Sequence, residues 1–174
     1  MLRRAGRKLS INAKLRIYKS VIRPTLEYGS PAMLNLSAEL STALDRFQRR
    51  SIRTVRNCDN DSLLPLVDSL TLRRSVAALQ ILHSVVYEQA PQEVLRSFRL
   101  FPKKFARSTR LATANHQFRF QVPGGPRSSR QFELSFLPNV LRLWNDLPPP
   151  LTFIRDPTRF RASLSAYLRS PLTM

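Results

Sequence analysis

The sequence predicts a mainly α-helical protein, in which a bundle of helices is followed by a small C-terminal module of a β-hairpin and two helices. Three observations lead to this prediction. Apolar residues recur at helical spacing over most of the first 90 residues. Helix-start signals precede several of these stretches. Between residues 118 and 136 the apolar period changes to two, which is typical of strands.

The first helix is expected to begin at Ile11, because Ser10 can cap its first turn. Its apolar stripe follows helical spacing and consists of Ile11, Leu15, Tyr18 and Ile22. Pro24 should break or kink this helix at Arg23, since proline lacks a backbone donor and clashes with the preceding turn.

A second helix should span residues 40–56, capped by Ser37 and with Glu39 in its first turn. At about 100° per residue it carries two opposed stripes. The apolar stripe, expected to be buried, consists of Leu40, Leu44, Phe47 and Val55. The basic stripe, with only Asp45 at its margin, consists of Arg46, Arg49, Arg50, Arg53 and Arg56. Closely spaced guanidinium groups favour a polyanionic partner, and the simpler alternative is a solvated surface face.

Further helices are expected over residues 71–89, capped by Ser69 or Thr71, and in a short stretch after Pro91. Alternation of phenylalanines predicts a strand over residues 118–122 and a second over 132–136, joined as a loose hairpin. The phenylalanines of the first strand either face the core or serve as base-stacking platforms. Val140, Leu141 and Trp144 share one helical face, and Asp156 followed by Pro157 starts the last helix.

Charge is distributed unevenly along the chain of 174 residues, whose net charge is +18. Residues 1–56 contain 13 Lys and Arg against 3 acidic residues, residues 57–100 contain 4 against 5, and residues 101–174 contain 12 against 3. We expect a helical region over residues 1–100 and a basic region over residues 101–174. The apolar runs are too short for a membrane span, and a single cysteine fits a reducing compartment, so the nucleus or cytoplasm is expected.

Signatures of enzymatic chemistry are absent from the sequence. Asp59 and Asp61 lie in a polar turn without a third carboxylate at useful spacing. His83 and His116 have no partner at zinc-ligand spacing, and Cys58 has no histidine nearby in the sequence. The sequence therefore predicts no cofactor, no metal and no catalytic residue.

Two stretches resemble the region that follows the catalytic palm in reverse transcriptases of non-LTR (LINE-type, jockey-like) retrotransposons. The first stretch comprises LRIYKSVIRPTLEYGSPAML and then LDRFQRRSIRTV, and it matches the family at Tyr18, Lys19, Ser20, Arg23, Pro24, Leu26, Tyr28, Phe47, Gln48 and Arg53. The second is FRFQVPGGPRSSRQFELSFLPNVLRLWNDLP, which matches at Val122, Pro123, Arg127, Arg130, Ser135, Phe136, Trp144, Asn145, Leu147 and Pro148. Met33 stands where the family often has tryptophan.

The resemblance implies that residues 1–100 form a thumb-like bundle that grips template and primer. The family's aromatic-Ala-Asp-Asp turn, which binds the catalytic metals, is missing here, as is the cysteine-histidine knuckle of some relatives. The chain is thus expected to be a truncated copy, without palm or endonuclease and without polymerase activity of its own.

The resulting hypothesis is that the chain binds RNA or an RNA–DNA duplex through backbone phosphates. The expected contacts are Lys19, Arg23, Arg46, Arg49, Arg50, Arg53, Arg56, Arg127 and Arg130. One alternative is a cellular interaction module with an acidic protein partner, and another is a non-functional remnant of the element. Self-association is also expected to be possible through apolar surface that a palm would normally cover.

Overall fold

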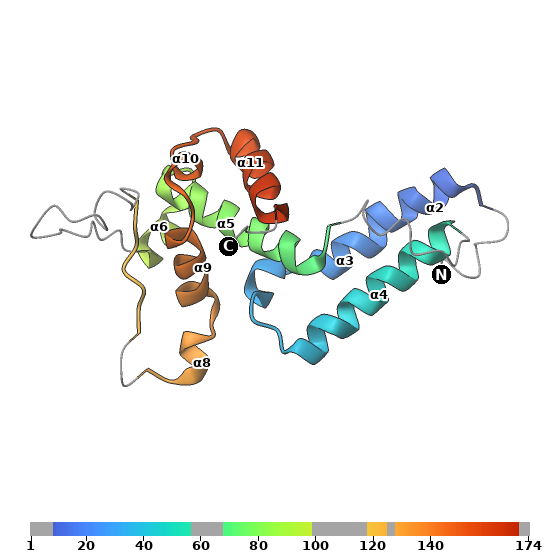
Figure 1. Cartoon of the computed structure of the whole chain (residues 1–174), viewed down its shortest axis with the longest axis horizontal. Helices are drawn as coiled ribbons and strands as arrows, with labels where there is room; N and C mark the ends of the chain where they lie inside the picture. The colour runs from blue at the N-terminus through green and yellow to red at the C-terminus, as the bar shows by residue number, and fades with distance from the viewer. Residues whose placement is uncertain (1–8, 57–67, 99–117, 125–127, 171–174) are drawn as a thin grey trace, which may run out of the picture. The chain divides into compact units, whose positions relative to one another are not determined.

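The structure is a computed structural model that describes residues 9–56, 68–98, 118–124 and 128–170 (Figure 1). Its helices in the first half are α2 (Ile11–Ile17), η1 (Tyr18–Ile22), α3 (Arg23–Glu27), η2 (Ser30–Met33), α4 (Ala38–Arg56) and α5 (Leu70–Val86). Those in the second half are α6 (Gln92–Ser97), α8 (Arg130–Glu133), α9 (Phe136–Asn145), α10 (Pro149–Thr152) and α11 (Pro157–Arg169). The prediction of a mainly α-helical protein is confirmed.

The chain divides into two compact units, residues 1–74 and residues 75–174, with the boundary inside α5. The sequence prediction had placed the division near residue 100, where the charge changes. From Ser75 onward α5 belongs to the second unit, where Nε2 of its His83 side chain lies 2.7 Å from the backbone carbonyl of Ile154.

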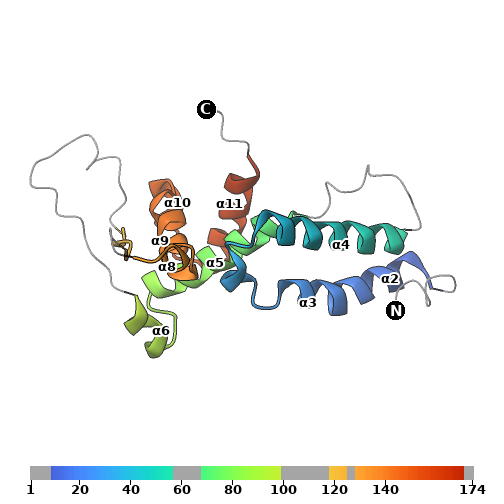
Figure 2. The same ribbon diagram turned by 90° about the horizontal axis from the view of Figure 1, so that it is seen from below.

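The first unit contains a helical hairpin. Helices α2, η1 and α3 follow one another as a single rod, and α4 runs back alongside it (Figures 1 and 2). Gly29 makes the reversal possible, since its φ of 65° lies in the left-handed region that residues with a Cβ seldom adopt. Ser10 caps the rod as predicted, its hydroxyl accepting from the amide of Ala13 at 3.3 Å.

Of the two outcomes predicted at Pro24, a break or a kink, the break does not occur. The turn before it, Tyr18–Ile22, is a π-helix, and the amide of Arg23 donates to the carbonyl of Tyr18, five residues earlier. Pro24 then falls in the first turn of α3, where a missing backbone donor costs little. The wider π turn absorbs the proline and lets the helix continue.

The second unit has a core in which α5, α9 and α11 meet. Phe160 of α11 is fully buried, stacks on His83 of α5 at a ring-centroid distance of 4.3 Å, and lies 5.9 Å from Trp144 of α9. The predicted start of α11 is confirmed, because the carboxylate of Asp156 accepts from the amides of Thr158 and Arg159. The predicted apolar face of α9 is buried as well.

The predicted hairpin is wrong. Within the described residues the structure holds no sheet: residues 118–124 are extended with an isolated bridge at Phe120, and the second expected strand is instead α8 and the start of α9. The extended segment is held by α9. The indole of Trp144 donates to the carbonyl of Phe118 at 2.8 Å, and the amide of Asn145 pairs with both backbone groups of Phe120, at 3.0 and 2.9 Å. Side chains of α9 thus bind the backbone of Phe118 and Phe120.

None of the helices in the described part of the chain is long and apolar enough to cross a membrane.

Candidate nucleic-acid interface

Helix α4 presents the predicted arginine stripe. The hydroxyl of Ser37 accepts from the amide of Leu40 at 3.3 Å, so the predicted cap is confirmed, and Glu39 lies in the first turn, where a negative charge is favourable. Nineteen residues of uninterrupted helix follow. A regular helix holds its side chains at fixed angular positions, and this rigidity is what makes a row of arginines a defined surface.

The face of α4 opposite the arginines anchors it to the first rod. Ile52 and Val55 are buried with Tyr18 in one cluster, and Ile17 and Ile22 pack against it. Gln48 and Ser51 are buried on the same face. The buried side of α4 is therefore centred on Gln48 and Val55, about 50° round the helix from the centre of the predicted apolar stripe.

Two members of the predicted apolar stripe lie outside this core. Leu40 is 56% exposed and Phe47 is 53% exposed, whereas Val55 is buried as predicted and Leu44 is partly buried. On the helical wheel the two exposed residues lie almost together, about 20° apart. They form an apolar strip between the buried face and the arginine stripe.

The stripe itself faces solvent: Arg46, Arg49, Arg50 and Arg53 are all exposed. They fall within an arc of about 100° and span about 10 Å of helix axis. In the described part of the chain, no ion pair reaches Arg46, Arg49 or Arg50. The side chain of Arg56 lies outside what the structure describes.

Asp45, the acidic residue at the margin of the stripe, interacts electrostatically with Arg74 of α5. Burial lowers the pKa of the Arg74 guanidinium, and the Asp45 carboxylate raises that pKa in partial opposition. Arg74 is 3% exposed, and its Nε and one Nη have no hydrogen-bond partner among the described residues. Asp45 therefore offsets part of the cost of a buried cation.

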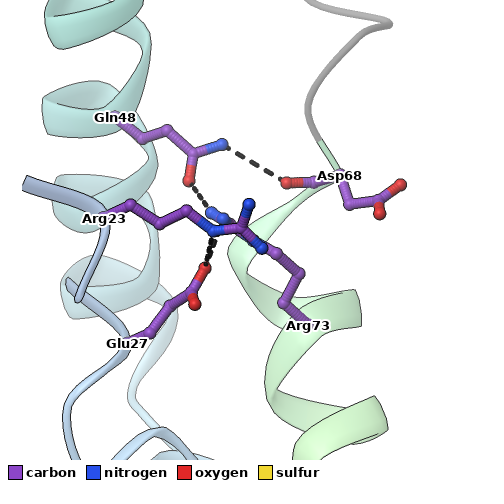
Figure 3. Close-up of polar contacts among 5 residues, drawn as sticks. All are labelled: Arg23, Glu27, Gln48, Asp68 and Arg73. Carbon is purple, nitrogen blue, oxygen red and sulfur yellow. Dashed lines mark hydrogen bonds and ion pairs between the residues drawn. The ribbon is translucent and has the colours of Figure 1, made fainter. Parts of the chain in front are cut away.

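Arg23, a predicted phosphate contact, is engaged within the protein. Its Nε donates to the Glu27 carboxylate at 2.9 Å, one helical turn away. The same carboxylate accepts from Arg73 of α5, which also donates to the amide oxygen of Gln48 (Figure 3). Gln48 in turn donates to the backbone carbonyl of Asp68 at 3.4 Å.

This network of Arg23, Glu27, Gln48, Asp68 and Arg73 joins α3, α4 and the start of α5 within the first unit (Figure 3). The i, i+4 spacing of Arg23 and Glu27 is visible in the sequence and predicts their pair. Nothing in the sequence indicates the part played by Arg73, because its partners are 25 and 46 residues away. Lys19, by contrast, is exposed on η1.

The predicted contacts of the second unit are not brought together by the described residues. Arg130 is exposed as the first residue of α8, and Arg127 lies outside the described residues. The buried Trp144 and Phe120 and the partly buried Phe118 belong to the core of this unit, so they are not stacking platforms.

Other chemistry has little support in the described parts of the chain. They contain no group of three histidine, cysteine or acidic side chains that could hold a metal. His83 is a core residue whose Nε2 lies 2.7 Å from the carbonyl of Ile154, and since a carbonyl only accepts, Nε2 carries the proton. Cys58, Asp59, Asp61 and His116 lie outside the described residues.

Comparison of the chain with protein-family models, with curated proteins and with solved structures gives no significant match.

Proposed function

We propose that this chain binds nucleic acid, RNA or an RNA–DNA duplex, through its backbone phosphates, with the arginine stripe of α4 as the principal contact. The observation that carries the proposal is the exposure of Arg46, Arg49, Arg50 and Arg53 on one face of a helix whose opposite face is anchored in a core. Arginine binds phosphate with two parallel donors, and it stays charged at any physiological pH.

The geometry of the stripe fits a phosphate backbone. About 10 Å of helix axis corresponds to about three phosphates of one strand, since these repeat about every 3.4 Å along a duplex. Contacts of this kind position a ligand without reading its bases, so we expect binding that is nearly independent of sequence. Of the expected contacts outside α4, Lys19 of the first unit is exposed and extends the basic surface of that unit, whereas Arg23 is paired with Glu27. Arg130 is exposed in the second unit.

We also propose that the chain originated as a fragment of a non-LTR retrotransposon reverse transcriptase. The two motif-bearing stretches quoted above support this origin. The fragment would serve as a binding element without polymerase activity, because two-metal phosphoryl transfer requires carboxylates that this sequence does not supply in the family's pattern.

Two variants with equal loss of charge test the proposal. In the first, Arg46, Arg49 and Arg50 become glutamine. In the matched control, the exposed Arg155, Arg159 and Arg161 of the second unit become glutamine. Fluorescence anisotropy against a labelled RNA–DNA duplex, repeated over a salt series, gives the slope of log affinity against log salt.

If three phosphate contacts are lost, the slope should become shallower by about 2–3 in the α4 variant and change little in the control. An equal change in both variants would show attraction by net charge alone, and the proposed interface would be wrong. Absence of binding to the duplex, together with binding to an acidic protein such as a polyglutamate-rich domain, would favour an interaction module instead.

A further inference from the structure

The one aromatic side chain of α4, Phe47, lies beside the arginine stripe. Phe47 is 53% exposed. About half of the ring is thus left uncovered by the described residues of the chain. Its backbone carbonyl is fixed by the hydroxyl of Ser51, which donates to it at 2.9 Å, so the ring projects from a well-ordered turn.

The neighbours of Phe47 leave the ring accessible and surround it with positive charge. Side chains on a helix lean toward its N-terminus, so the Phe47 ring extends over Ala43, whose methyl group is small and exposed. Arg50 follows one turn later, at the i+3 position, and leans back toward the ring. Arg46 precedes Phe47 in the sequence but lies about 100° further round the helix, within the arginine stripe. A flat apolar surface thus adjoins the exposed guanidinium of Arg50 and borders the stripe that contains Arg46.

We propose that Phe47 is a stacking platform for an unpaired base of single-stranded nucleic acid whose phosphates are held by Arg46 and Arg50. This inference rests on the proposed function and names its substrate more narrowly. Every base offers a π-face, so stacking adds affinity without adding sequence preference. Bases within a duplex already stack on each other, so the platform favours single strands and the frayed end of a duplex.

Other occupants fit the same surface less well. A lipid bilayer takes up a helix through a broad apolar face, but the broad apolar face of α4, with Ile52 and Val55, is buried in the core. The exposed strip is one side chain wide, with Leu40 and Phe47 in line. A second copy of the chain would bring two strongly basic regions together, since residues 1–56 contain 13 basic and 3 acidic side chains.

The test compares two single-stranded ligands of equal charge, each about 12 nucleotides long. One is oligo(dA), and the other is an abasic strand that has the same phosphates but no bases. Both are titrated with the full chain and with the variants Phe47→Ala and Phe47→Trp. Leu40→Ala is the matched control, because it removes an equally exposed apolar side chain that has no ring.

The wild-type chain should bind oligo(dA) about 5–100 times more tightly than the abasic strand. Phe47→Ala should bring this ratio close to one without changing the affinity for the abasic strand, while Phe47→Trp and Leu40→Ala should keep it. Since Phe47 is exposed, circular dichroism should show unchanged helicity for all three variants.

Three results would overturn the inference. The first is equal affinity of the wild-type chain for oligo(dA) and for the abasic strand. The second is an equal loss of affinity for both strands in Phe47→Ala. The third is a loss of affinity for oligo(dA) in Leu40→Ala that is as large as the loss in Phe47→Ala. If the chain binds both strands equally, and phosphatidylserine vesicles displace them only when Phe47 is present, the apolar strip of Leu40 and Phe47 would be assigned to a membrane surface. Salt-dependent binding of the abasic strand with a ratio of one would leave the phosphate interface standing and remove only the platform. Failure to bind either strand or the duplex would refute both proposals.

Discussion

Replacing Asn145 should destabilise the second unit more than any other change of one polar side chain on α9. Its side-chain amide both accepts from the backbone N–H of Phe120, at 3.0 Å, and donates to the backbone carbonyl of the same residue, at 2.9 Å. Phe120 is 1% exposed, so both of its backbone groups depend on the Asn145 amide more than on water in the folded protein. The pairing therefore satisfies one backbone donor and one backbone acceptor of Phe120.

The magnitude follows from the two backbone groups left behind. A buried donor or acceptor without a partner costs about 1–3 kcal/mol, so Asn145→Ala should lower the free energy of unfolding by about 2–5 kcal/mol. Asn145→Asp keeps the acceptor for the Phe120 amide but sets a carboxylate against the Phe120 carbonyl, and it should also destabilise. Asn139→Ala, which removes donation to two partly buried carbonyls, should cost less.

Urea denaturation followed by tryptophan emission measures this effect selectively, because Trp144 is the only tryptophan and is completely buried in the second unit. Its emission should shift to longer wavelength at a lower urea concentration in Asn145→Ala. If the unfolding free energy of that variant fell by less than about 0.5 kcal/mol, the extended segment would not depend on the side-chain pairing, and the reasoning would be refuted.

Three further predictions concern buried polar groups. Tyr18→Phe should raise the free energy of unfolding by about 1 kcal/mol, because the buried Tyr18 hydroxyl has no partner among the described residues; a thermal melt that shows a loss of stability would contradict this. Burial lowers the pKa of His83 below its usual 6.5, outweighing the hydrogen bond to Ile154 and the nearby Asp156 carboxylate, which raise it. The unfolded chain then binds the proton first, so the second unit should be stable above about pH 6.5 and lose stability as the pH falls below it, and urea midpoints that stay constant down to about pH 5 would show otherwise. Glu27→Gln removes the shared carboxylate of the network and should cost about 1–3 kcal/mol, seen as faster amide hydrogen exchange in α3 and α4, with exchange in α9 as the internal reference that stays unchanged.

The helix caps and the arginine stripe could be predicted from the sequence because they depend on local rules. A serine or aspartate before an amphipathic run satisfies backbone donors two or three residues away, and Ser10, Ser37 and Asp156 all do so. Helical periodicity alone places the arginines of α4 on one side, and they are exposed there.

Tertiary contacts decided what local rules could not. Alternating phenylalanines predict a hairpin, but the second half of that stretch forms α8 and the start of α9, and the side chains of Trp144 and Asn145 bind the first half. Which apolar residues of α4 are buried depended on the position of Tyr18 and its neighbours, and this left Phe47 exposed. Periodicity fixes the angle between residues on a helix, whereas the direction in which the helix faces its core is set by residues far away in the chain.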